Sequence, residues 1–537
     1  MTISGKLIDL HQQRIYNAEI QLEGNTIRAV KEVLSTVDEQ YILPGLIDAH
    51  IHVESSMLVP TEFARLAVVH GTVATISDPH EIANVLGIPG VDFMIKNGQK
   101  SPFKFYFGAP SCVPATKFET AGAEITRHDV EQLMQRADIY YLAEMMNWPG
   151  VLQGDKEVFE KIAAAHRFGK PVDGHAPGLR NDDAKKYIDA GISTDHECFT
   201  AEEALDKLRY GMKILIREGS AAKNFEALAP LIPEYYQNMM FCSDDKHPDS
   251  LLEGHINLLI KRCLQKNFDI FKVLQMACIN PVNHYKLDVG LLRAGDKADF
   301  IIIDHPEKFN ILKTFINGQQ VAERGKSLLH SQASETPNHF SASLIEPDEL
   351  AVSDTGEPIK VIEVLDGELI TRRIEVKPLV SNGQIIPDQE NDILKLVVVN
   401  RYKPAKPAIA FIKNMGFRDG AIVSSVAHDS HNIIAAGTSD EFLARAINLV
   451  IQSKGGIAAV NANTSELIPL PVAGLMSNID GYQMAADYIR IDQLVKQMGS
   501  KLKAPFMSLS FMALLVIPSI KLSDLGLFDA EKFRFIE

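Results

Sequence analysis

The sequence has little of what secreted, membrane and nucleic-acid-binding proteins usually contain. Cysteine occurs only five times in 537 residues, and no two cysteines form a Cys-x-x-Cys pair. An odd number of unpaired cysteines is typical of reduced thiols in a cytoplasm and argues against a disulfide framework. No uninterrupted apolar run reaches membrane-spanning length, and the first residues, MTISGKLIDLHQQ, lack the basic-then-apolar pattern of a signal peptide. We therefore expect a cytoplasmic protein.

An excess of positive charge is also missing. The net charge is -15, from 54 basic and 69 acidic residues, which argues against general binding to nucleic acid or to anionic membranes. The hydrophobic content of 46% and charged content of 23% fit a soluble globular protein. Because the chain is too long for one ordinary domain, we expect several domains and a large core.

The middle of the chain, residues 44–284, repeats strand-then-helix units. Eight apolar strand candidates follow one another, and helical patterns such as TEFARLAVVHG and KEVFEKIAAAHRFG stand between them. Alternating strands and helices of this number and length predict an α/β fold with a (β/α)8 TIM-like barrel.

The regions on either side of the middle have a different texture. Residues 1–43 and 285–335 are rich in strand patterns and carry hairpin signals, QLEGNTI and INGQQV. We predict that they build one small composite β-sandwich domain. A polar Ser/Thr/Pro-bearing stretch, residues 327–350, is typical of a linker. Strand and helix patterns then alternate again, which predicts a C-terminal α/β domain over residues 345–537.

Metal-ligating residue types stand where the predicted strands end. Residues i and i+2 of a strand point to the same side, so His50 and His52 of LPGLIDAHIHVESS would lie side by side. Further strand ends carry Glu144, His175, His196 and Asp244. A barrel brings these ends around one mouth. Buried imidazoles and carboxylates are costly without a partner, and together they suit Zn²⁺, Mn²⁺ or Fe²⁺.

Each of these residues also has an ordinary structural interpretation. His50 and His52 could be surface histidines at a half-exposed strand end, and Glu144 could be a solvated strand end. Six such residues in the right order favour the metal site. The loop after the second strand adds Asp78 and Glu81. An aspartate in a Ser-Asp-Pro turn commonly caps a helix, so a structural role and a substrate contact both stay open there.

The pattern resembles the amidohydrolase superfamily, with His-x-His after the first strand, histidines at the fifth and sixth, and an aspartate at the eighth. Many two-metal members carry a carbamylated lysine at the fourth strand, where this chain has Glu144. In that respect it is similar to the bacterial adenine deaminase family. The stretches SDPHEIANVLG, VDGHAPGL, STDHE, AHDSHN and LPVAGLMS match that family as well, so the resemblance covers nearly the whole chain.

The resemblance implies hydrolytic deamination of adenine to hypoxanthine and ammonia in purine salvage. A hydroxide bound to a two-metal centre would attack the purine, and the metals would be Mn²⁺ or Fe²⁺, with Zn²⁺ as a further possibility. The implied ligands are His50, His52 and Asp244 on one ion, His175 and His196 on the other, and Glu144 bridging both. We also expect a homo-oligomer, most simply a dimer.

Three acidic residues would carry the proton chemistry. Asp244 would act as a general base and then as an acid, with Asp245 as the alternative if the strand ends one residue later. Asp78 and Glu81 are the candidates for a contact to the adenine ring, which must be protonated during the reaction.

Two other functions remain open from the sequence. Another amidohydrolase, acting on a cyclic amide or a dipeptide, would use the same metals, and a non-catalytic barrel scaffold is a further alternative. The late stretch AHDSHN, residues 427–432, could form a second metal site, although no additional ligand cluster accompanies it in the sequence. A loop that packs over the barrel mouth, or one that stabilises a subunit contact, is the favoured interpretation.

Overall fold

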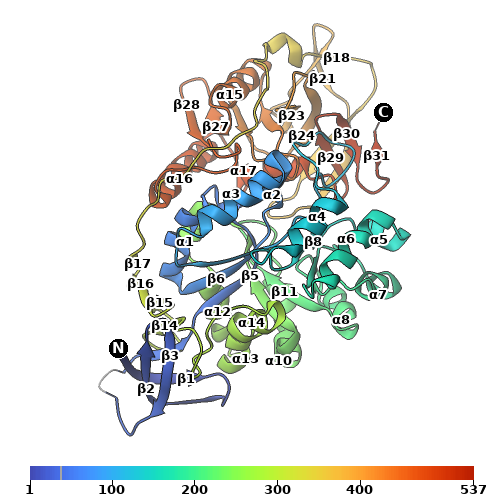
Figure 1. Cartoon of the computed structure of the whole chain (residues 1–537). Helices are drawn as coiled ribbons and strands as arrows, with labels where there is room; N and C mark the ends of the chain where they lie inside the picture. The colour runs from blue at the N-terminus through green and yellow to red at the C-terminus, as the bar shows by residue number, and fades with distance from the viewer. Residues whose placement is uncertain (37–38, 537) are drawn as a thin grey trace.

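The structure is a computed structural model that describes residues 1–36 and 39–536. Figure 1 shows a β-rich unit around the N-terminus, a central region of strands and helices, and a C-terminal region on the opposite side of that centre. Among the described residues, no helix is both long enough and apolar enough to cross a membrane.

One eight-stranded sheet joins the two flanks of the middle region, in the order β17-β16-β15-β14-β4-β1-β2-β3. Its strands are β1 (Thr2–Asp9), β2 (Arg14–Glu23), β3 (Thr26–Glu32), β4 (Tyr41–Pro44), β14 (Phe300–Ile303), β15 (Ile311–Ile316), β16 (Gln319–Glu323) and β17 (Lys326–Ser327). Strand β4 pairs in parallel with β1 and antiparallel with β14, so it connects the N-terminal strands to the later ones. A β-rich unit built from both flanks is therefore present, as the hairpin signals predict.

The middle region contains parallel strands in sequence order. They are β5 (Leu46–His52), β6 (Thr72–Ser77), β7 (Lys104–Phe107), β8 (Leu142–Met145), β9 (Val172–Gly174), β10 (Thr194–Asp195), β11 (Lys213–Arg217), β12 (Met239–Cys242) and β13 (Asp244–Asp245). Their ladders fall into three pieces, β13-β5-β6-β7, β8-β9 and β10-β11-β12. The predicted α/β arrangement is confirmed, but the hydrogen-bond ladder does not run unbroken around a barrel.

Amphipathic helices cover these strands. In α6 (Lys156–Arg167), Asp155 caps the first turn by accepting from the backbone N–H of Glu157 and Val158, and the apolar face buries Val158 and Ile162. The other helices are α1 (Pro60–Ala67), α2 (His80–Leu86), α3 (Ile88–Gly98), α4 (Arg127–Gln135), α5 (Trp148–Gln153), α7 (Asn181–Asp189), α8 (Ala201–Arg209), α9 (Phe225–Leu228), α10 (Ile232–Tyr235), α11 (Pro248–Glu253), α12 (Ile256–Gln265), α13 (Ile270–Leu274) and α14 (Asn280–Tyr285).

The C-terminal region is built on a second eight-stranded sheet, ordered β20-β19-β24-β23-β26-β25-β27-β28. Its strands are β19 (Ile359–Val364), β20 (Thr371–Val376), β23 (Ile393–Val399), β24 (Ala408–Lys413), β25 (Ala421–Ser424), β26 (Ile433–Gly437), β27 (Gly456–Val460) and β28 (Ser465–Pro469). Two three-stranded sheets lie beside it, β18 (Val352–Ser353), β21 (Leu379–Ser381) and β22 (Gln384–Ile386), and β29 (Ile520–Ser523), β30 (Gly526–Asp529) and β31 (Arg534–Phe535). The helices are α15 (Asp440–Gln452), α16 (Gly481–Gln497) and α17 (Pro505–Ser510), so the strand–helix alternation predicted here is present.

The C-terminal region packs directly against the middle region. One buried hydrophobic cluster contains side chains of both, for example Val53 and Leu514. Arg65 of α1 pairs with Asp480 at 2.6 Å, and the backbone N–H of Ser477 donates to Met57 O at 2.8 Å. Residues 328–346, which connect β17 to this region, contain no helix or strand. This contact places C-terminal side chains beside the ends of the parallel strands.

Candidate metal centre and active site

The first strand supplies two histidines to a buried cluster of possible metal ligands. Strand β5 is buried throughout, and His50 and His52 stand at its carboxyl end. His52 Nε2 lies 3.2 Å from Asp244 Oδ1 and 3.2 Å from Glu144 Oε1. His50 Nε2 lies 3.6 Å from the same Asp244 oxygen. The first, fourth and eighth strands thus meet at one point, as the barrel rule predicts.

Glu144 stands between two groups of histidines. While Oε1 faces His52, Oε2 accepts from His175 Nδ1 at 2.9 Å and lies 3.3 Å from His196 Nε2. His50, His196 and Asp244 form one group with metal-binding spacing, and Glu144, His175 and His196 form another. The structure therefore brings all six predicted ligands together.

The chemistry of this donor set fits divalent cations. The six side chains are between 1% and 6% exposed. Neither ring nitrogen of His50 has a hydrogen-bond partner among the described residues, and the same holds for His175 Nε2. Burial opposes ionisation of Glu144, yet the surrounding histidines hold its pKa well below the usual range. Ionised carboxylates beside unpartnered imidazole nitrogens are what Mn²⁺, Fe²⁺ or Zn²⁺ coordinates.

Arg217, the last residue of β11, holds the carboxylate of Asp244 in place. Its NH1 donates to Asp244 Oδ2 at 2.8 Å, and both terminal nitrogens pair with Glu197, NH2 at 3.1 Å from Oε2. Burial disfavours charge on Asp244, but Arg217 and the histidines hold its pKa well below the usual range. The sequence argument missed Arg217 and Glu197 because it looked for metal ligands. The strand-end rule itself would have found Arg217 in KILIREG.

The structure distinguishes Asp244 from Asp245. Asp244 has a φ of 56°, in the left-handed region, and its carboxylate turns toward His50 and His52. Asp245 instead accepts from Ser55 Oγ at 2.5 Å and lies 3.9 Å from His428 Nε2. Asp244 therefore faces the two histidines of β5, and Asp245 faces Ser55 and the C-terminal region, although both acids lie within metal-binding spacing of His52.

We call the group of six possible ligands, His50, His52, Glu144, His175, His196 and Asp244, the metal-type cluster. Asp78 and Glu81 lie beside it, but other side chains already contact their carboxylates. Asp78 accepts from the backbone N–H of His80 and from His80 Nδ1, both at 3.0 Å. Glu81 Oε1 accepts from His428 Nδ1 at 2.5 Å, and Oε2 pairs with His431 Nε2. His80, to which the sequence argument assigned no role, lies 3.4 Å from Glu144 Oε1 through Nδ1.

Comparison with known proteins identifies the family. The amidohydrolase family model matches residues 41–321, and the adenine deaminase C-terminal domain model matches residues 368–534. A curated adenine deaminase of Sulfurovum sp. (strain NBC37-1) is 53% identical over 538 residues, covering 100% of this chain and 99% of that protein. The chain belongs to the adenine deaminase family of amidohydrolases.

Other members are similarly close to this chain. The adenine deaminase of Salinibacter ruber is 51% identical over 100% of this chain and 98% of its own length, and that of Methanosarcina barkeri is 49% identical over 100% and 99%. Among solved structures, N-acetylglucosamine-6-phosphate deacetylase from Pasteurella multocida matches 60% of this chain and 100% of its own, at 13% identity and a TM-score of 0.47.

The C-terminal domain of the family lies over the mouth of the metal-type cluster. The pocket that contains His52, Glu144, His175, His196 and Asp244 is completed by four C-terminal side chains, Leu369, His428, Asp429 and Leu514. Among the interpretations of AHDSHN, the structure places this loop against the mouth. His80 and Glu81, which follow the second strand and were not assigned as metal ligands, also line this pocket.

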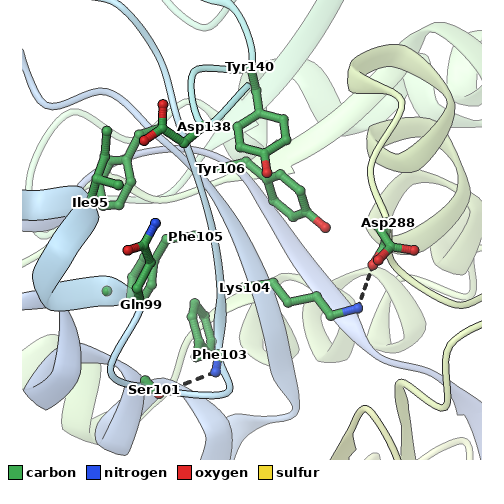
Figure 2. A pocket seen from close by; sticks show the side chains of 12 residues that line it. Ile95, Gln99, Ser101, Phe103, Lys104, Phe105, Tyr106, Asp138, Tyr140 and Asp288 are labelled. Atoms are coloured by element: carbon green, nitrogen blue, oxygen red, sulfur yellow. Dashed lines mark hydrogen bonds between the residues drawn. The ribbon is translucent and has the colours of Figure 1, made fainter. Parts of the chain in front are cut away.

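A second pocket lies at the opposite end of the parallel strands. Figure 2 shows the side chain of Lys104, the first residue of β7, extending away from the rings of Phe103 and Phe105 toward Asp288. Lys104 Nζ donates to Asp288 O and pairs with Asp299 at 2.7 Å, so its charge is already satisfied. This pocket lies at the amino end of β7, whereas the metal-type residues stand at the carboxyl ends of the strands.

Proposed function

We propose that this chain hydrolyses adenine to hypoxanthine and ammonia, in purine salvage. The observation that carries the proposal is Glu144, whose two oxygens face separate groups of histidines at the mouth of the parallel strands. Identity of about half of all positions with curated adenine deaminases, over the whole chain, supports adenine as the substrate.

The proposed architecture is a closed (β/α)8 barrel over residues 44–284. Strand β13, which follows β12 after Ser243, pairs in parallel with β5 and so brings the end of the eighth strand to the first. A bridge between Ala109 and Leu142 connects the β7 and β8 pieces, and Ser193 N–H donates to Val172 O between β9 and β10. The composite β domain would comprise residues 1–43 and 285–335, and the C-terminal domain residues 345–537.

The proposed cofactor is a pair of divalent ions, Mn²⁺ or Fe²⁺, with Zn²⁺ as the third candidate. Following the family resemblance, His50, His52 and Asp244 would hold one ion and His175 and His196 the other, with Glu144 shared by both. Metal-binding spacing supports the second group, Glu144 with His175 and His196, and also brings His50 and Asp244 together with His196. When bound, such ions lower the pKa of water toward neutrality and polarise it for attack on the amino-bearing carbon of adenine.

Asp244 would move the protons. Arg217 holds Asp244 Oδ2, so Oδ1 is the oxygen left facing the cluster, where it can accept a proton from water and return it to the leaving amine. Asp78 and Glu81 remain candidates for the contact to the purine ring. Because histidines engage both carboxylates, an indirect role through His80 and the C-terminal loop has the better support.

The test is adenine turnover by manganese-loaded protein beside a Glu144→Ala variant, with Glu131→Ala as the control. Glu131 is an exposed residue that pairs with Arg167 on the surface. We expect ammonia release and the adenine-to-hypoxanthine absorbance change from wild type and control, and neither from Glu144→Ala, which should also bind less metal. Wild-type protein that binds metal but leaves adenine unchanged would contradict the substrate, and cyclic amides and dipeptides would then be assayed.

The proposed oligomeric state is a homodimer. Light scattering on the same preparation gives the molar mass and decides between one chain of 59.4 kDa and a multiple of it.

A further inference from the structure

The C-terminal loop places a carboxylate in the active-site pocket that has no role in the chemistry described so far. Asp429 lines the pocket together with His428, across from Glu144 and Asp244. It is 4% exposed, and its Oδ2 has no hydrogen-bond partner among the described residues. Its Oδ1 lies 3.7 Å from His80 Nε2 and 4.0 Å from His428 Nδ1, both beyond hydrogen-bonding distance.

The carboxylate of Glu81, in the same pocket, is hydrogen-bonded on both oxygens and so contrasts with that of Asp429. Both Glu81 oxygens have an imidazole partner, His428 for one and His431 for the other. A buried carboxylate without such a partner is costly, and structures rarely retain one without a ligand or another donor to satisfy it. We therefore expect a molecule bound in the pocket to donate an N–H or O–H hydrogen bond to the Asp429 carboxylate.

The imidazole ring of His80 separates Asp429 from the metal-type cluster. The imidazole of His80 lies between the two, with Nδ1 3.4 Å from Glu144 Oε1 and Nε2 3.7 Å from Asp429 Oδ1. A planar bicyclic base that presents its six-membered ring to Glu144 and Asp244 would extend its five-membered ring along His80, toward Asp429.

Adenine has one donor at that end. Its five-membered ring carries one N–H as the free base, and in a nucleoside the ribose replaces that hydrogen. We propose that Asp429 accepts a hydrogen bond from this ring N–H, so that the C-terminal domain selects the free base over its N9-substituted forms. The inference rests on the proposed adenine deaminase function and names the residue that determines its specificity.

The loop is held in place for this task. His428 and His431, on either side of Asp429, are both bound to Glu81, and Ser430 O accepts from Tyr402 OH at 2.5 Å. A carboxylate fixed in this way loses little conformational entropy when the ligand arrives. A site built around a buried acceptor discriminates strongly against an analogue that lacks the donor, because that analogue leaves the carboxylate unpaired.

A cation is the competing occupant, since His80, Glu81 and Asp429 have metal-binding spacing. The base is favoured because both oxygens of Glu81 are already bound to histidines of the same loop. Metal content separates the two occupants, because a third ion would be lost with Asp429 whereas a substrate contact would not change the number of bound ions.

The experiment compares Asp429→Asn and Asp429→Ala with wild type and with the control Asp348→Asn, an exposed aspartate of the same domain. Three quantities are measured on manganese-loaded protein: kcat/KM for adenine, the inhibition constant of 9-methyladenine, which lacks the ring N–H, and bound metal per chain. We expect kcat/KM for adenine to fall by about 10- to 100-fold in both Asp429 variants, as for a lost hydrogen bond to a charged group. The inhibition constant of 9-methyladenine should not rise in either Asp429 variant and should fall where the unpaired carboxylate has been removed. Metal content should not change, as in the control.

Each contrary result has a clear meaning. Equal weakening of adenine and 9-methyladenine, or unchanged adenine turnover in Asp429→Ala, overturns the proposed contact. Loss of bound metal in the Asp429 variants overturns it in favour of a cation site. Absence of ammonia release by the wild type contradicts the proposed function itself, and the inference with it, before any variant is compared.

Discussion

Glu81 of α2 accepts a hydrogen bond of 2.5 Å from His428 Nδ1, across 347 positions of the chain. The second Glu81 oxygen pairs with His431, and all three side chains are buried. One carboxylate of the middle region thus fastens the C-terminal loop to the mouth of the metal-type cluster.

Replacing Glu81 by glutamine should loosen this attachment. The variant keeps the shape of the side chain but removes the charge that two buried imidazoles share, and breaking a buried pair of this kind costs about 3–5 kcal/mol. We expect a lower unfolding temperature and faster proteolysis of residues 328–346, measured by thermal denaturation and limited digestion. The control is Glu226→Gln, at an exposed pair with Arg262 and Lys266 worth at most about 1 kcal/mol. Indistinguishable unfolding temperatures for the two variants would contradict this role of Glu81.

Arg217→Lys should reduce kcat more than it raises KM. Lysine keeps the positive charge but cannot hold Glu197 and Asp244 with one planar fork, so Asp244 would lose its fixed orientation. A misplacement of roughly 1 Å in a catalytic group can cost about 100-fold in rate. Steady-state kinetics and metal analysis measure the effect, with Arg490→Lys as the control at an exposed acidic pair. A change confined to KM would show that Arg217 acts on binding alone.

Removal of metal should destabilise the wild type. Ions that bind only the folded state stabilise it by about 2.7 kcal/mol at a concentration 100 times the dissociation constant. We therefore expect a chelator to lower the unfolding temperature and Mn²⁺ to restore it. Glu144→Ala provides the control, because it lacks the carboxylate shared by both ligand groups and should respond little to either treatment. An equal response of the variant would place the stabilising ions elsewhere.

Glu119 should make stability depend on pH. Burial, and then the neighbouring Asp429, raise the pKa of Glu119 to about 8, and its Oε2 has no hydrogen-bond partner among the described residues. The folded protein therefore keeps a proton that the unfolded chain releases near its ordinary value of 4.5. The folded state binds more protons in this window, so stability falls as the pH rises from about 4.5 to about 8.

Glutamine at position 119 cannot ionise and should remove this contribution. We expect Glu119→Gln to unfold at a higher temperature than the wild type at pH 8, with a difference that shrinks toward pH 5. Thermal denaturation over that range measures it. A difference between the two proteins that stays constant with pH would show that Glu119 is ionised in the folded state.

That the six candidate ligands lie close together could be predicted because each one follows a local pattern. His50, His175 and His196 stand where apolar strands end, and the parallel arrangement brings such ends together whatever the details of packing. The choice between Asp244 and Asp245 was not accessible in the same way, since it depends on a left-handed backbone conformation at Asp244 that reverses which acid faces the histidines.

Contacts between segments far apart in the chain could not be predicted from any local pattern in the sequence. The AHDSHN stretch was recognisable as rich in possible ligands, but its partner Glu81 belongs to a different part of the chain, and no periodicity connects them. The parallel strands were predicted correctly, whereas the breaks in their ladder between β7 and β8 and between β9 and β10 left no mark in the apolar patterns. The same is true of the irregular register between Asp48 and Ile51 within the β5–β6 pair.

The 347 positions between Glu81 and His428 also set an order of events during biosynthesis. At ribosomal rates of about 5–20 residues per second, Glu81 waits roughly 20 to 70 seconds before its partner is synthesised. During that interval the nascent middle region has an open mouth, a carboxylate without its imidazoles and an uncovered apolar rim. The last third of the chain thus completes the pocket, because Leu369, His428, Asp429 and Leu514 are synthesised after every other side chain that lines it.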